Sequence, residues 1–133
     1  MSNLFQQGTF KLHSGEVSNL KIECDALTTE DWDTLAKLIA QNMFFTEVIG
    51  IERGGLPLAK ALEKYIGHRE GSKIVLIADD VLTTGESMEK AKEQVKGRVR
   101  DVFGVVVFAR RKCPEWVYPI FQMSEWEWVN AST

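Results

Sequence analysis

Three uninterrupted apolar runs constrain the fold of this chain most strongly. They occupy residues 48–51, 74–78 and 102–109. A strand with one face in water alternates apolar and polar residues, whereas a strand covered on both faces is apolar throughout. The three runs therefore predict strands of a parallel sheet that is buried between helices.

The segments between these runs have apolar residues at helical spacing. Thr28 and Thr29 are candidate N-caps of the first helix, and Gly67 fits the end of the second. The third helix is expected to begin near Ser87 and to run to Gly97. Strands and helices thus alternate, which predicts an α/β fold with an open, mainly parallel twisted sheet flanked by helices, with ligands beyond the carboxyl ends of the strands. The apolar stripes are Trp32, Leu35, Ala36 and Ile39; Leu58, Ala59, Leu62, Tyr65 and Ile66; and Met88, Ala91 and Val95.

The first 28 residues are less regular, with a possible short strand at residues 20–24. We expect them to form a small N-terminal hood that folds over the sheet. The chain has 133 residues, of which 44% are apolar and 26% charged. This size and composition predict one domain over residues 1–133.

Charge, hydropathy and cysteine content argue against several functional classes. The net charge of -3 and the lack of a basic stripe argue against a nucleic-acid surface. No segment resembles a signal peptide, and residues 102–109 are too few to span a bilayer, so we expect a cytoplasmic protein without a membrane contact. Cys24 and Cys113 have no metal-site spacing and are expected to be reduced thiols. His13 and His68 are isolated, and we assign neither a catalytic role.

An acidic pair and a hydroxyl-rich loop follow the second apolar run. Asp79 and Asp80 end the predicted strand, where two carboxylates are costly to bury unless they meet solvent, donors or a cation. Thr83, Thr84, Gly85, Glu86 and Ser87 come next, at the predicted start of a helix. Backbone N–H groups and three hydroxyls in such a loop can converge on a phosphate. The alternative is a plain capping turn, with Ser87 or Thr84 as the cap, but capping does not explain the acidic pair.

A second loop follows the first apolar run, at residues 50–57. Gly54 and Gly55 permit close backbone approach or a positive φ, and Arg53 supplies a permanent cation. Such a loop suits a pyrophosphate group. A tight strand-to-helix turn, with Pro57 in the first helical turn, is the alternative for this segment alone.

Residues 75–87, VLIADDVLTTGES, closely resemble the signature of type I phosphoribosyltransferases that binds 5-phosphoribosyl-1-pyrophosphate (PRPP). The resemblance implies that Thr83, Thr84, Gly85, Glu86 and Ser87 hold the 5′-phosphate. A small residue is commoner in the family at the position of Glu86, but the backbone N–H of Glu86 can still donate to a phosphate. Asp79 and Asp80 would lie by the ribose hydroxyls. Mg²⁺ would be the cofactor, held by the substrate near these two residues and not ligated directly by the protein.

The family resemblance also gives the second loop a role. A loop at this place binds pyrophosphate and often contains a cis peptide, which maps onto Glu52 and Arg53. Glu52, Arg53, Gly54 and Gly55 would then form the pyrophosphate site. Arg53 would stabilise the departing pyrophosphate, and Asp79 and Asp80 would favour the cationic sugar transition state, so these three residues form the expected catalytic set.

The amino-terminal residues 10–28 look like the opening of orotate phosphoribosyltransferases. His13 and Glu16 stand where family members usually have basic residues. The expected partners are therefore PRPP and a nucleobase, either orotate or another pyrimidine or purine. Dimers are common in the family, so we also expect a homodimer.

Type I enzymes generally insert a flexible basic hairpin before the strand that leads to the acidic pair. Here only residues 67–73 lie at this place. Arg69, Lys73, Arg110, Lys112 or a partner subunit are the alternatives for the missing charge. A non-catalytic PRPP or nucleotide sensor is therefore the rival hypothesis.

Two further classes fit less well. In a response-regulator receiver the acidic pair follows the first strand, and a nucleotide hydrolase would show GxxxxGK[ST] or GxGxxG, neither of which occurs. The aromatic residues of segment 113–121, with Trp126 and Trp128, are expected to pack in the core or at an interface, with stacking on a base as the alternative.

Overall fold

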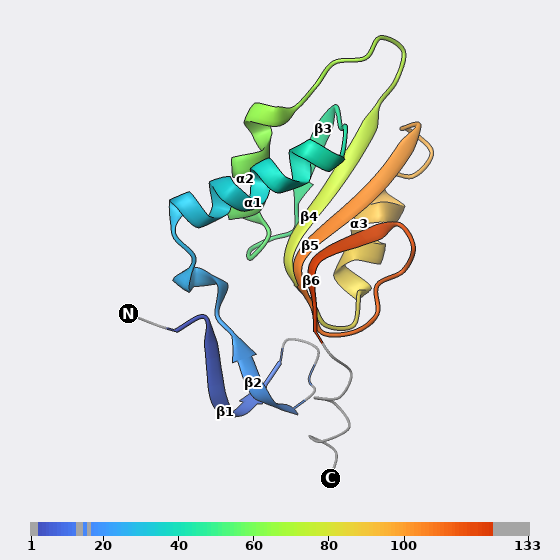
Figure 1. Ribbon diagram of the computed structural model, residues 1–133. Coiled ribbons are helices and arrows are strands. Elements are labelled where there is room, and N and C mark those ends of the chain that lie inside the picture. The colour runs from blue at the N-terminus through green and yellow to red at the C-terminus, as the bar shows by residue number, and fades with distance from the viewer. Residues whose placement is uncertain (1–2, 13–14, 16, 124–133) are drawn as a thin grey trace.

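The computed structural model describes residues 3–12, 15 and 17–123 (Figure 1). Its main sheet has four parallel strands in the order β3-β4-β5-β6. Helices α1 and α2 lie on one face and α3 on the other, which confirms the predicted fold class. The strands are β3 (Glu47–Gly50), β4 (Ile74–Leu82), β5 (Asp101–Ala109) and β6 (Val117–Gln122); the helices are α1 (Thr29–Asn42), α2 (Leu56–Leu62) and α3 (Glu86–Val95), with short 3-10 turns η1 (Cys24–Ala26) and η2 (Glu63–Tyr65).

Helix α1 begins where its capping residues predict. The Asp31 N–H donates to Thr28 Oγ1 at 3.1 Å, and the Thr28 N–H donates to Asp31 Oδ2 at 2.8 Å. This reciprocal pair satisfies two backbone donors that the first helical turn leaves open, so Thr28 and not Thr29 is the cap.

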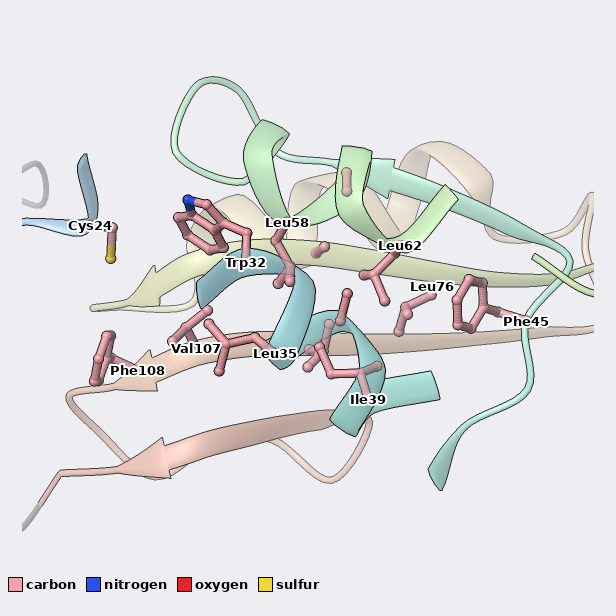
Figure 2. Packing of buried hydrophobic residues seen from close by; sticks show 14 residues of the cluster. Cys24, Trp32, Leu35, Ile39, Phe45, Leu58, Leu62, Leu76, Val107 and Phe108 are labelled. Atoms are coloured by element: carbon pink, nitrogen blue, oxygen red, sulfur yellow. The ribbon is translucent and has the colours of Figure 1, made fainter. Parts of the chain in front are cut away.

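The core lies on both faces of β4. Residues 74–78 are all buried, as the uninterrupted apolar run predicts. On one face Trp32 and Leu35 of α1 and Leu58 of α2 meet the sheet (Figure 2). On the other face Met88 packs from α3. Packing on both faces of β4 therefore fixes the position of this strand, and of the acidic pair near its carboxyl end, relative to the helices.

Two predicted boundaries were wrong. Strand β4 does not end at the acidic pair but continues to Leu82, because Val81 and Leu82 pair with Phe108 and Ala109 of β5. Helix α2 ends at Leu62 and tightens into η2, so Gly67 is not its stop.

Strand β6 was not predicted. It pairs in parallel with β5 and forms one edge of the sheet, although it contains Pro119. Tyr118 and Phe121 are half exposed on it, whereas the Trp116 indole N–H donates to Glu89 Oε1 of α3 at 2.9 Å. Part of the aromatic segment therefore packs as expected, while Trp126 and Trp128 lie outside the described residues.

The amino-terminal segment forms an antiparallel hairpin of β1 (Phe5–Lys11) and β2 (Val17–Ile22). It makes a separate two-stranded sheet at the carboxyl ends of β4 and β5, where a hood was predicted (Figure 1). The short strand expected at residues 20–24 is thus the second half of β2. His13 and Glu16 lie outside the described residues. Across the described part of the chain, the helices fall short of the length and apolarity that a membrane span requires.

Candidate functional site

The acidic pair lies near the carboxyl end of β4. Asp79 is 9% exposed, and Asp80 is partly buried. The Asp80 N–H donates to Asp79 Oδ1 at 2.8 Å, and the Val81 N–H donates to Asp80 Oδ1 at 2.7 Å. Burial above all, and then the hydrogen bond and charge of Asp80, raise the pKa of Asp79 to about 8. A cation or hydroxyl donors at this place would favour the ionised form of Asp79.

The glycine loop between β3 and α2 touches this pair. The Ile51 N–H donates to the Ala78 carbonyl of β4 at 2.9 Å, which extends the parallel ladder into the loop. A Cβ added to Gly54 would overlap the Asp80 carboxylate, and a Cβ added to Gly55 would overlap the Ala78 carbonyl oxygen. Both glycines are therefore required for the close approach of this loop to β4.

The peptide bond between Glu52 and Arg53 is cis, as the family resemblance implies. Both side chains are exposed. The Gly55 N–H donates to the Ile51 carbonyl at 2.8 Å and closes the loop around this peptide. The loop is thus a tight turn between β3 and α2 that carries the exposed Arg53 one residue before the Gly54 contact with Asp80.

The hydroxyl-rich loop joins β4 to α3. Gly85 has φ +87°, a left-handed conformation that favours glycine, and it occupies the N-cap position, which the alternative of a plain capping turn would give to Ser87 or Thr84. Thr84 Oγ1 accepts from the Glu86 N–H at 3.3 Å. Thr84, Glu86 and Ser87 are exposed, and Thr83 and Gly85 are partly buried. Because the first N–H groups of a helix lack intrahelical partners, this loop offers an anion several donors.

The structure brings the two predicted loops and the acidic pair to one edge of the sheet. Gly54 meets Asp80 directly, and Thr83 follows Leu82 at the end of the same strand. Sequence reasoning did not connect Cys24 of η1 with the acidic pair. Its thiol is buried, and burial, followed by the charge of Asp80, raises its pKa to about 12. Cys24 is therefore within electrostatic range of Asp80.

The basic residues considered for the missing charge lie at different places in the fold. Arg69 and Lys73 precede β4 and so lie toward its amino end, away from the acidic pair, and the Arg69 guanidinium is 4.3 Å from the centroid of the Phe44 ring. Lys112 is exposed in the connection that follows β5. Arg110 is 1% exposed and donates to Ser18 Oγ and to the Leu20 carbonyl. Residues 66–73 contain a turn and no strand.

Two apolar grooves of about 620 and 730 Å³ flank α1. Neither is lined by Asp79 or Asp80. Among the residues that the structure describes, no group of three or more His, Cys, Asp and Glu side chains is suited to hold a metal ion. The candidate site is therefore defined here by its two loops and its carboxylates.

Comparison with known proteins identifies the class. No protein-family model matches the sequence. The orotate phosphoribosyltransferase of Thermococcus kodakarensis is 30% identical over an alignment 133 positions long. This alignment covers 79% of this chain and 72% of that protein. The chain therefore belongs to the type I phosphoribosyltransferase family, as its fold and its phosphate-loop signature indicate.

Within this family the chain resembles orotate phosphoribosyltransferases in particular. The enzyme of Pyrobaculum aerophilum is 27% identical over 154 residues, covering 89% of this chain and 80% of that protein. That alignment is longer than the whole chain of 133 residues, so the relative contains residues without a counterpart here. The crystal structure of orotate phosphoribosyltransferase from Aeropyrum pernix superposes with a TM-score of 0.73 at 21% identity, over 90% of this chain and 88% of that chain.

Proposed function

We propose that this chain transfers the phosphoribosyl group of PRPP to a nucleobase nitrogen. The acceptor is orotate or another pyrimidine or purine, and pyrophosphate is released. The observation that carries the proposal is the contact of Gly54 with the Asp80 carboxylate, because it joins a pyrophosphate loop to a ribose-binding pair. The 5′-phosphate loop begins just beyond, at Thr83.

The donor half of the site would act by positioning and by charge. The N–H groups of Gly85, Glu86 and Ser87, with the hydroxyls of Thr83 and Thr84, hold the 5′-phosphate at the amino end of α3. Asp79 and Asp80 accept hydrogen bonds from the ribose hydroxyls. PRPP would be bound as its magnesium complex, and a Mg²⁺ ion held by the substrate near the pair would favour the ionised form of Asp79, whose pKa burial raises in the free protein.

The bond changes take place at C1′ of this ribose, where pyrophosphate leaves and the base enters. The C1′–O bond to pyrophosphate breaks, and the base nitrogen forms the new bond to C1′. Glu52, Arg53, Gly54 and Gly55 bind the pyrophosphate, with the Arg53 guanidinium neutralising the charge that develops on it. Asp79 and Asp80 stabilise the positive charge that develops on the sugar.

A second copy of the chain would supply the remaining cation. Residues 66–73 form only a short turn at the amino end of β4, and Arg110 is engaged by the hairpin. We therefore propose a homodimer in which a basic side chain reaches the neighbouring site. Analytical ultracentrifugation with and without PRPP measures whether the chain forms this dimer.

Calorimetry with PRPP and Mg²⁺ tests the donor site. We expect the wild type to bind and the Asp80→Asn and Thr84→Ala variants to lose at least about tenfold in affinity, since each loses a hydrogen bond to a charged group. Asp33→Asn and Thr29→Ala, replacements of the same chemistry at a half-exposed and an exposed position of α1, serve as matched controls and should bind like the wild type.

Release of pyrophosphate with orotate, uracil, adenine, guanine and hypoxanthine tests the transfer. Release with one base establishes the transferase and its acceptor. Binding of PRPP without release for any base would favour the sensor, and absence of binding would refute the assignment of the donor site.

A further inference from the structure

Arg110 is the largest of the fully buried side chains of the described residues. It follows β5 directly, and its backbone N–H donates to the Leu82 carbonyl of β4 at 2.9 Å. Leu82 is the last residue before the phosphate loop. The arginine thus starts from the same edge of the sheet as the acidic pair.

The guanidinium of Arg110 reaches away from this edge to the hairpin. Nη1 donates to Ser18 Oγ at 3.2 Å, and Nη2 donates to the Leu20 carbonyl at 2.7 Å. Ser18 is itself 3% exposed, and its Oγ also accepts from the Leu20 N–H at 3.1 Å. A buried guanidinium is costly to desolvate unless its donors are bonded, so these contacts specify where β2 must lie.

An aromatic contact holds the other strand of the hairpin. The ring centroids of Phe5 in β1 and Phe108 in β5 lie 5.6 Å apart, nearly perpendicular, and Phe108 stacks on Phe121 of β6 at 5.4 Å. A two-stranded sheet has little stability by itself, so its position depends on such contacts. Phe108 and Arg110, two residues apart, therefore fix β1 and β2 separately.

The fixed hairpin lies where an acceptor must enter. Arg110, which holds β2 through the Leu20 carbonyl, is also bonded through its backbone N–H to Leu82, directly before the phosphate loop. Under the proposed function the base approaches the ribose at this carboxyl edge of the sheet, where the hairpin lies (Figure 1). We infer that Arg110 is a positioning residue that clamps the hairpin and thereby shapes the acceptor subsite without touching the donor; this inference rests on the proposed function.

Paired substitutions on the two sides of the contact test this role. Ser18→Ala removes one acceptor and leaves the arginine in place, and Arg110→Lys keeps the charge but not the fork of donors. Each should raise the KM for the acceptor base about tenfold or more, the factor expected for loss of a charge-assisted hydrogen bond. The Kd for PRPP with Mg²⁺ should stay within about threefold of the wild type, because the donor loops are untouched. Arg98→Lys, an exposed arginine in the connection that precedes β5, is the matched control.

Hydrogen exchange of the hairpin supplies a readout that does not require turnover. Backbone amides of β1 and β2 should exchange faster in both variants than in the wild type and the control. Equal losses of acceptor and PRPP binding, or unchanged exchange of the hairpin, would overturn the inference. A raised KM in Arg110→Lys without faster exchange of the hairpin amides would also overturn it, because the arginine would then not act through the hairpin. If the wild type releases no pyrophosphate with any base, the proposed function fails, while the exchange experiment still decides whether the clamp exists.

Discussion

Replacement of Asp79 by Asn is expected to stabilise the free protein at neutral and alkaline pH. Burial raises the pKa of Asp79 from 3.8 to about 8. The unfolded chain loses this proton near pH 4 and the native protein near pH 8, so the native state binds one more proton between these values. The contribution of Asp79 to the free energy of unfolding is greatest below about pH 4. It decreases as the pH rises and is lost once the pH passes about 8.

The magnitude follows from the size of this shift. The free energy of unfolding falls by at most about 1.4 kcal/mol for each pH unit in this window, or on the order of 5 kcal/mol across all of it. Asn cannot ionise, and its carbonyl oxygen can still accept from the Asp80 N–H. The Asp79→Asn variant should therefore gain stability over the wild type as the pH rises.

Urea unfolding of both proteins from about pH 5 to about pH 9 measures this gain. The difference in free energy of unfolding should grow toward pH 8 and then level off. Asp33→Asn is the control, since Asp33 is half exposed in an ion pair with Lys64 and its replacement should change stability by less than about 1 kcal/mol at any pH. A difference between Asp79→Asn and the wild type that does not vary with pH would refute the reasoning.

Three other substitutions test the site and the core. Gly54→Ala should weaken binding of PRPP with Mg²⁺ at least about tenfold in calorimetry, because its Cβ overlaps the Asp80 carboxylate; unchanged affinity would contradict the proposed contact. Gly85→Ala should cost about 1 kcal/mol in urea unfolding, since φ is +87° there, and a stabilised variant would contradict this. Leu58→Ala should cost about 2 to 5 kcal/mol, whereas Leu56→Ala, 46% exposed on the same helix, should cost far less; equal losses would contradict the core assignment.

The parallel sheet and both loops could be predicted because their signals are local. An apolar run with covered faces, such as residues 74–78, has no polar residue to interrupt it, and capping residues such as Thr28 mark a helix start directly. The loop at Gly54 and the loop at Gly85 follow predicted strands at a fixed edge of the sheet. Their nearness to the acidic pair therefore follows from the topology of the fold.

Strand β6 and the role of Arg110 could not be predicted in this way. Residues 110–116 are too few for the helical crossover that usually joins parallel strands, and Pro119 argues against a strand. Arg110 and Ser18 are 92 residues apart, and no local pattern connects them. Only the folded arrangement of hairpin and sheet brings the guanidinium to its acceptors.

The separate sheet formed by β1 and β2 has an evolutionary consequence. Its backbone ladder is independent of the ladder that supports the two loops of the candidate site, so mutations along the hairpin can accumulate while the site on β4 and α3 stays intact. Under the proposed function, the first 28 residues would then determine which nucleobase is accepted. This specificity could change between lineages almost independently of PRPP binding. Grafting the hairpin of a relative onto this sheet, with Ser18 and Arg110 retained, is the corresponding route to a changed acceptor.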